Sequence, residues 1–574
     1  MRRFLSLLFV WVWVTASPAA ADSPLADING IENADLRQQV LDILGRTEAG
    51  PEDEISMRRN LRTAQNRAIR YLRSQGYYAV RIDSELDEEG RPLLSIELGT
   101  RYTVGRFSIE AFPDTAANTA EAAIQLAPDQ WLTADWVLEN EAMGLAAIEN
   151  AGWPEADILE REVIIDHAAR EGTVTFRYNP GPFSRYGGID LASPEWRAPF
   201  IGRLASLQPG DPVALEDLDQ FEARLGRLES VRRAEVRMSP VGPDGEETRP
   251  VIVELEAAPR HAIEASLGYS TTEGAGLNLG WSRRNMFAGD ETLNISSEVA
   301  TLVQSLSASL TIPHWRRADQ GLVLTGGLKS EDTDAFQQEE ALAGFSFYRD
   351  LTDELTFRAG TSFDYSRVTD ALGVRDISSL RGNVALALDQ RDDPLDPSSG
   401  VHAAVILRPG YSFGDTSPVY LQTELRGSAY YSLAENLVLA ARTRIGMTMG
   451  TGAADLAADQ RFYAGGGGSA RGFEFQSLSP IGPNGAPFGG LSVIEMSGEA
   501  RWRSEGRWGA AAFVDSAFAS ASRTPQFDEM RAAFGVGVRY HLDFAPIRFD
   551  IATPFDRRPG EDAVHFYISI GQAF

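Results

Sequence analysis

Residues 261–270 read His-Ala-Ile-Glu-Ala-Ser-Leu-Gly-Tyr-Ser, and their hydrophobic period is two. The apolar positions are Ile263, Ala265, Leu267 and Tyr269. A strand through them has one apolar face and one polar face. The stretch from Ser305 to Ile312 alternates in the same way. This pattern is typical of an antiparallel sheet, and it leaves open whether the sheet is soluble with one wet face or forms a transmembrane barrel.

The N-terminal residues favour the membrane alternative. Arg2 and Arg3 precede an apolar run from Phe4 to Val14, and three alanines precede Asp22. This order predicts a cleaved secretory signal peptide over residues 1–21. The apolar run is about half of the ~20 residues that a spanning helix needs, and no later segment is long enough. An exported chain of this kind can cross a membrane only as a closed β-barrel, and is otherwise a soluble secreted protein.

Composition argues against several classes of function. Of 574 residues, 53 are basic and 81 are acidic, and the net charge of −28 disfavours nucleic acid as a partner. Lys329 is the only lysine, which removes every Gly-Lys pair of a phosphate-binding loop. Cysteine is absent, and the six histidines are scattered. We therefore expect no enzymatic activity, no metal site and no cofactor.

The hydrophobic period changes near residue 260. Before this point helical periods alternate with short strands, and a unit of roughly 75 to 80 residues occurs three times. One helical face of the first unit carries Leu61, Ala64, Ala68 and Leu72. Gly76 ends that helix, and a strand is predicted to begin at Tyr77.

The second and third units repeat this order. In the second, a helix through Leu145 and Ile148 leads to Gly152, and a strand covers Thr173 to Tyr178. The third has a helix through Leu218, Phe221 and Leu225, a strand from Val231 to Val236, and a closing strand with Val251, Val253 and Leu255 on one face. We expect each unit to bury one small sheet under two helices.

Each unit has the order helix, glycine, strand, loop, strand. This order resembles the POTRA domain, the periplasmic module that precedes the barrel in the BamA/TamA family. The resemblance implies α+β POTRA repeats over residues 22–100, 101–181 and 182–260, followed by an all-β transmembrane barrel over residues 261–574. The barrels of this family have sixteen antiparallel strands. A glycine after a helix is also an ordinary C-cap, so the serial repetition supports the resemblance more than any single copy does.

Further segments resemble the same family. They are Asp389–Leu395, Arg461–Gly466, Ala470–Phe473 and the final strand, which carries Phe566, Ile568 and Ile570 on one face and ends on Phe574. Asp389–Leu395 is also explained as a charged hairpin turn, since Pro394 and a following glycine suit a turn. The three repeats and the long stretch after the glycine run are most similar to the TamA type.

The resemblance implies a function and a set of partners. It implies a Gram-negative outer-membrane assembly factor, with its POTRA region in the periplasm, that helps to insert nascent barrel proteins such as autotransporters. It also implies membrane lipid as a contact and a TamB-like partner, anchored in the inner membrane and docking on the first POTRA domain. Two alternatives remain open: a two-partner-type secretion pore that exports an unfolded protein, and lipid transport to the outer membrane. A secretion pore would be expected to have two repeats and a plug helix, and a porin would not need the repeats.

The resemblance also assigns a loop latch. In the family an Arg-Gly-Phe loop tip enters the barrel lumen and pairs with a carboxylate of the wall. The corresponding tip residues are Arg471, Gly472 and Phe473. Asp515 is the implied partner of the arginine, and Asp550 is a second candidate, whereas a lone loop arginine is ordinarily a solvated charge. The family usually has glycine where Ala517 stands and valine or isoleucine where Ala470 stands, which leaves the local backbone geometry open.

The barrel seam is the second candidate site. To close the barrel, the strand His261–Ser270 must pair with the last strand, Val564–Phe574. An opened seam offers two unpaired strand edges, which can template another strand by backbone hydrogen bonding. The candidate seam residues are Ile263, Leu267, Ile568, Ile570, Gly571 and Phe574. Gly571 either weakens this pairing or forms only a bulge or a strand end.

Overall fold

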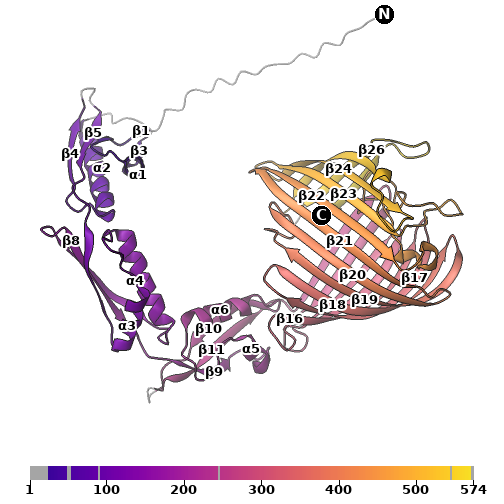
Figure 1. The fold of residues 1–574 in the computed structure, drawn as a ribbon, viewed down its shortest axis with the longest axis horizontal. Coiled ribbons are helices and arrows are strands. Elements are labelled where there is room, and N and C mark those ends of the chain that lie inside the picture. The colour runs from indigo at the N-terminus through magenta and orange to yellow at the C-terminus, as the bar shows by residue number, and fades with distance from the viewer. Residues whose placement is uncertain (1–22, 48–53, 88–90, 243–245, 543–545, 571–574) are drawn as a thin grey trace, which may run out of the picture. The chain divides into compact units, whose positions relative to one another are not determined.

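The fold is that of a computed structural model, which describes residues 23–47, 54–87, 91–242, 246–542 and 546–570. The predicted signal peptide, Gly571 and Phe574 lie outside these residues. The chain divides into two compact units, one of residues 1–188, 207–220 and 237–251, and the other of residues 189–206, 221–236 and 252–574. No helix in the described ranges is long and apolar enough to cross a membrane. Along the chain, three α/β domains precede a β-barrel (Figure 1).

The first α/β domain packs two helices on one three-stranded sheet. The strand order is β2-β5-β4, with β2 parallel to β5 and β4 antiparallel to it. The elements are β2 (Asp27–Asn29), α1 (Ala34–Leu44), α2 (Glu54–Ser74), β4 (Arg81–Leu86) and β5 (Pro92–Glu97). A separate two-stranded pair joins β1 (Ser23–Pro24) to β3 (Arg46–Thr47). The predicted helical face is confirmed, since its four residues, Leu61, Ala64, Ala68 and Leu72, are all buried in the core of this domain.

The strand predicted from Tyr77 begins four residues later, at Arg81. Gly76 ends α2 with a φ of +92°, as its position predicts. The Tyr77 N–H donates to the Leu72 carbonyl at 2.9 Å, and the Val80 N–H donates to the Tyr77 carbonyl at 3.3 Å. The prediction was wrong because these residues cap the helix and complete a turn before the chain can extend.

The second and third α/β domains repeat the arrangement of the first. Their sheets have the orders β6-β8-β7 and β10-β11-β9. The second contains β6 (Thr103–Glu110), α3 (Asp114–Ala123), α4 (Ala134–Glu149), β7 (Asp157–Asp166) and β8 (Glu171–Asn179). The third contains β9 (Arg185–Leu191), α5 (Ala198–Leu204), α6 (Leu215–Gly226), β10 (Val231–Met238) and β11 (Thr248–Ala257). The predicted sheet with two helices is therefore present in all three, and this fold is consistent with POTRA repeats.

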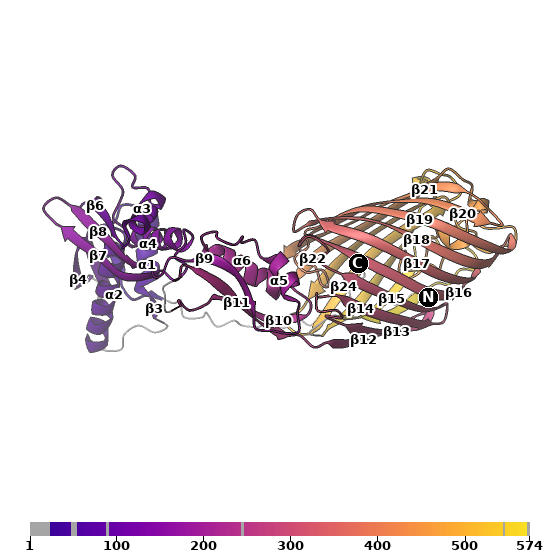
Figure 2. The same cartoon turned by 90° about the horizontal axis from the view of Figure 1, so that it is seen from below.

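Sixteen antiparallel strands, β12 to β27, form a closed barrel in chain order, as the resemblance implies. Figure 2 shows β12 to β19 lying next to one another in sequence along the wall. The first eight are β12 (His261–Ser270), β13 (Gly274–Arg283), β14 (Thr292–Ala300), β15 (Val303–Ile312), β16 (Gln320–Asp332), β17 (Gln337–Asp350), β18 (Leu355–Asp370) and β19 (Gly373–Asp389). The last eight are β20 (Gly400–Gly414), β21 (Val419–Ala434), β22 (Leu437–Met449), β23 (Ser492–Arg503), β24 (Trp508–Ser520), β25 (Arg531–His541), β26 (Pro546–Pro554) and β27 (His565–Ile570).

Alternation along the strands separates the outer face of the barrel from its lumen. On β12, Ile263 is 80% exposed and Leu267 is 66% exposed. On β24, Val514 is 46% exposed, while its neighbours Phe513 and Asp515 are buried. Apolar side chains thus cover the outside and polar ones turn inward, which is the arrangement of a transmembrane barrel rather than of a soluble sheet.

Leu72→Ala should destabilise the first α/β domain by about 2–5 kcal/mol, because Leu72 is completely buried and the smaller side chain leaves a cavity. The change is measured by hydrogen exchange, as faster exchange in peptides from α2 and β5 with unchanged exchange in β18 and β19. Ile55→Ala is the matched control on the same helix, because Ile55 is 82% exposed. Equal exchange in the two variants would contradict the packing of α2.

Candidate functional site: the lumen loop and the barrel seam

The loop of residues 450–491 joins β22 to β23 and places its tip inside the barrel wall. Ala470, Arg471 and Phe473 at the tip are all buried. Gly465 and Gly472 have φ values of +107° and +93°, a region that favours glycine. A Cβ on Gly472 would lie 2.6 Å from the Ala533 Cβ, so the tip can approach the wall only without a side chain there.

Arg461 fastens the base of the same loop. Its guanidinium group donates to the Asp370 carboxylate on β18 at 2.8 Å and to the Phe488 carbonyl at 3.0 Å. The guanidinium carbon also lies 3.9 Å from the centroid of the Phe488 ring, within the range of a cation–π contact. Because Arg461 is 4% exposed, this is a buried attachment of the loop to the barrel wall.

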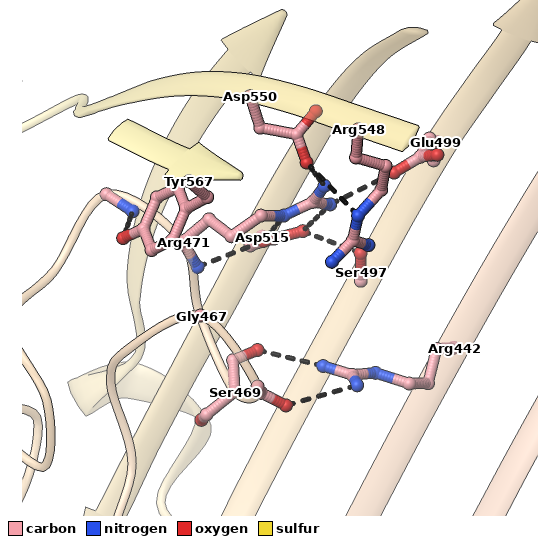
Figure 3. A network of polar contacts seen from close by, with 12 residues as sticks. Arg442, Gly467, Ser469, Arg471, Ser497, Glu499, Asp515, Arg548, Asp550 and Tyr567 are labelled. Atoms are coloured by element: carbon pink, nitrogen blue, oxygen red, sulfur yellow. Dashed lines mark hydrogen bonds and ion pairs between the residues drawn. The ribbon is translucent and has the colours of Figure 1, made fainter. Parts of the chain in front are cut away.

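The guanidinium group of Arg471 contacts three carboxylates (Figure 3). Its Nε and Nη2 donate to Asp515 at 2.7 and 3.1 Å, and its backbone N–H donates to the same carboxylate at 3.0 Å. Nη1 donates to Asp550 at 3.0 Å, and Nη2 lies 3.1 Å from Glu499. The guanidinium carbon lies 3.3 Å from the centroid of the Phe513 ring. This bidentate and stacked geometry fixes both the position and the orientation of the loop tip.

Three further arginines share these carboxylates. Arg539 pairs with Asp550 and lies 3.4 Å from Glu499. Arg501 lies 2.9 Å from Glu499, and Arg548 lies 4.0 Å from Asp550. Buried charges are tolerated when they are paired and hydrogen-bonded, so removing one member leaves its neighbours without compensation. In the part of the chain that the structure describes, no group of three or more His, Cys, Asp or Glu side chains is placed to hold a metal ion.

The structure brings Arg471 together with both carboxylates named for it from the sequence, Asp515 and Asp550. The two were weighed as alternatives, whereas both bind the guanidinium group at once, and Glu499 contacts it as well. Sequence reasoning missed Glu499. A period of two shows that Ser497 and Glu499 share one face, but the register that pairs Ser497 with Asp515, and so brings Glu499 to Arg471, is set by the sheet.

The two positions at which the sequence departs from the family pattern lie beside the loop tip. Ala470 and Ala517 are completely buried and belong to one apolar cluster with Phe473. The guanidinium carbon of Arg531 lies 4.9 Å from the centroid of the Phe473 ring. Small side chains at both positions leave room for the tip against the wall.

The loop also contacts both sides of the barrel seam. Glu273, in the turn between β12 and β13, accepts a hydrogen bond from the Gly467 N–H at 2.7 Å. The Gly472 N–H donates to the Tyr567 hydroxyl on β27 at 3.0 Å. Burial raises the pKa of Glu273, although the hydrogen bond from Gly467 partly opposes this shift. The loop therefore bridges the first hairpin and the last strand of the barrel.

Arg442 on β22 holds the loop between these two contacts. Its Nη1 and Nη2 donate to the carbonyls of Gly468 and Ser469 at 3.2 and 2.9 Å (Figure 3). The Ser469 hydroxyl donates to Glu495 at 2.7 Å. The contacts of Arg442 were not predicted from the sequence, since backbone carbonyls of a loop leave no signal in its side chains.

The seam joins β12 to β27, the first and last strands of the barrel. Within the described residues β12 pairs with β27 only at Tyr269↔Ile568 and Ser270↔Tyr567, whereas it pairs with β13 along its whole length. Beyond the strand, the Thr271 N–H donates to the Phe566 carbonyl at 3.1 Å, and the Phe566 N–H donates to the Thr271 hydroxyl at 3.2 Å. The description of β27 ends at Ile570, so the seam ladder is described only at the end of β12 that contains Tyr269 and Ser270.

The predicted seam residues have different places in this arrangement. Ile568 pairs with Tyr269 across the seam. Ile263 and Leu267 lie on the outer face, with no partner on β27 among the described residues. Ile570 pairs with Ile547 on β26. The strand expected over Val564–Phe574 is described only as β27, which begins one residue later at His565; Gly571 and Phe574 fall outside the described residues.

The chain was compared with protein-family models, with curated proteins and with solved structures, and it is similar to members of each. The model of the Omp85 superfamily domain matches residues 285–574. The outer membrane protein assembly factor BamA of Nitratidesulfovibrio vulgaris is 25% identical over 387 residues, which cover 64% of this chain and 48% of that protein. The chain thus spans about half the length of this curated relative.

Solved structures of similar fold include a BamA from Haemophilus ducreyi lacking POTRA domains 1–3. It has a TM-score of 0.69 and 15% identity, and the match covers 82% of this chain and all of that one. CdiB from Acinetobacter baumannii matches with a TM-score of 0.49 and 14% identity over 82% of this chain and 90% of its own. At these identities the first likeness concerns the fold alone.

Arg471→Ala should release the loop tip, because the buried Asp515 loses the arginine that pairs with it, at a cost of about 3–5 kcal/mol. The release is measured as faster proteolysis within residues 461–491. Arg471→Lys keeps the charge without the planar fork and should give an intermediate rate. Arg557→Ala, which changes an exposed arginine between β26 and β27, is the control. Proteolysis of Arg471→Ala at the control rate would show that this network does not hold the loop.

Glu273→Ala should loosen the seam, because it removes the contact between the first hairpin and the loop. A Tyr269→Cys/Ile568→Cys pair reports seam closure, and we expect it to oxidise more slowly with Glu273→Ala. Glu273→Gln keeps an acceptor oxygen and should largely restore the rate. Tyr567→Phe removes the other contact, so combining it with Glu273→Ala should add little. An oxidation rate unchanged by Glu273→Ala would count against the bridge.

Proposed function

Because this chain belongs to the Omp85 superfamily, we propose that it is an outer-membrane assembly factor that helps to insert other β-barrel proteins. The observation that carries the proposal is the seam, where β12 and β27 share two residue pairs in the described structure. They are the only neighbouring strands of the described barrel sheet that are not consecutive in the chain. The seam is therefore the junction whose two strands no direct connection along the chain holds together.

The chemistry of the seam suits the templating of a strand. Backbone N–H and C=O groups without partners in a bilayer cost several kcal/mol each, so an incoming strand that pairs with them lowers the free energy of the membrane-inserted state. The strand β12 carries outward apolar side chains such as Ile263 and Leu267. A client strand with apolar and polar residues in alternation would continue both faces of this wall.

We also propose the narrower role that the sequence resemblance implies. In it the protein is of the TamA type, its POTRA region faces the periplasm, and its clients include autotransporters. A TamB-like protein anchored in the inner membrane docks on the first POTRA domain, and the protein has no enzymatic activity. The three α/β domains before the barrel and the Arg471 tip support this role.

The loop favours a lateral route for clients over a route through the lumen. Its base is attached through Arg461 and its tip through Arg471, and both guanidinium groups are buried in ion pairs with the wall. A secretion pore would have to break both attachments for each exported chain. Lateral opening requires the separation of β12 from β27 and the loss of the contacts at Glu273 and Tyr567, while both attachments of the loop to the wall can stay in place.

A disulfide across the seam tests the proposal directly. Tyr269→Cys and Ile568→Cys place cysteines directly opposite each other, and the chain has no native cysteine to compete. We expect oxidation to stop the assembly of client barrels in cells that depend on this protein, because the gate can no longer open. A reductant should restore assembly.

The matched control is the pair Phe363→Cys and Leu380→Cys, which face each other across β18 and β19. All four positions lie on the outer face of the barrel, and only the first pair spans the seam. Oxidation of the control pair should leave assembly unchanged. Undiminished assembly with a fully oxidised seam would exclude the lateral gate and favour lipid transport or a purely periplasmic role.

A further inference from the structure

The outer face of α2 carries a straight row of exposed arginines. The row, called here the arginine stripe, consists of Arg59, Arg62, Arg70 and Arg73. Steps of three, eight and three residues keep the four on one side of an α-helix. The opposite side of α2 is the buried face that contains Ala68 and Leu72. The stripe therefore lies on the side of the helix turned away from the core of its own domain.

The stripe is a positive surface on a strongly acidic protein. The chain has a net charge of −28, whereas α2 contains six arginines and a single acidic residue, Glu54 at its first position. Among the residues that the structure describes, none of the four guanidinium groups of the stripe forms an ion pair. Arg70 donates to the backbone carbonyl of Asn66 at 3.3 Å, a contact that leaves its charge uncompensated.

We propose that the arginine stripe binds the phosphate groups of an anionic phospholipid surface. From Arg59 to Arg73 the helix rises about 21 Å, so a flat surface can contact all four side chains at once. Each guanidinium group presents a planar fork that matches phosphate oxygens. Near an anionic membrane each arginine increases the affinity about fivefold, and these increments multiply along the row.

A phospholipid surface fits the stripe better than an acidic protein does. Protein interfaces obtain most of their affinity from buried aromatic or arginine anchors in fitted pockets, and isolated exposed ion pairs contribute little. The stripe contains no aromatic residue, and Asn66 occupies its centre. Ile55, 82% exposed, lies one turn before Arg59 on the same line, where it can enter the headgroup layer. In the cell this binding rests on the proposed function, which puts the α/β domains in the periplasm and so beside a membrane.

Vesicle binding by the full chain tests the inference without reference to client assembly. The protein is held in nanodiscs of phosphatidylcholine and mixed with separate vesicles of phosphatidylcholine, with or without phosphatidylglycerol. We expect it to float only with vesicles that contain phosphatidylglycerol, and to be released by salt. Arg59→Gln/Arg62→Gln/Arg73→Gln should weaken binding about a hundredfold, since three increments are lost. Glutamine keeps a good helix former at each site, so α2 stays folded.

The matched control is Arg106→Gln/Arg227→Gln/Arg233→Gln, which removes the same charge from three exposed arginines of the second and third domains. Its binding should equal that of the unchanged protein. Equal loss in both triple variants, or no preference for phosphatidylglycerol, would overturn the proposal. In cell envelopes a photoreactive label on Asn66→Cys should yield lipid adducts. If the label formed an adduct with a protein and not with lipid, the arginine stripe would be assigned to an acidic protein partner. That result would also overturn the proposal.

Discussion

A sheet that crosses a lipid bilayer must pair its first and last strands, because unpaired backbone groups there have no water to bind. In this barrel the requirement falls on β12 and β27, which share two residue pairs in the described structure and two hydrogen bonds between Thr271 and Phe566. A backbone hydrogen bond contributes roughly 0.5–1.5 kcal/mol net. The described part of the ladder therefore contributes only a few kcal/mol to closure of the seam, and contacts outside the ladder add to it.

The lumen loop supplies those contacts. Its tip binds Asp515, Asp550 and Glu499 through Arg471, and breaking such a buried network costs about 3–5 kcal/mol. The same tip reaches Glu273 on the first hairpin and Tyr567 on the last strand. Loop position and seam closure are therefore energetically linked, so movement of either one changes the free energy of the other.

The sequence predicts local features better than distant contacts. Leu61 and Leu72 showed the buried face of α2, and the alternation from Ile263 to Tyr269 showed a two-faced strand, because both patterns depend on neighbours along the chain. The strand number and the Arg471 latch came from resemblance. The full partner set of Arg471 could not be predicted, because its carboxylates lie on β23, β24 and β26 and their register is set by the closed sheet. The start of β4 was misplaced because hydrogen bonds of Tyr77 complete a turn.

The central claim is that the seam opens reversibly while the rest of the barrel stays closed. Hydrogen exchange of single amides, measured by nuclear magnetic resonance in a lipid bilayer, tests it directly. The Thr271 and Phe566 amides, which bond across the seam, should exchange long before the amides that join β18 to β19. Equal protection at the seam and at β18–β19 would mean that the barrel opens only by unfolding, and would contradict the account.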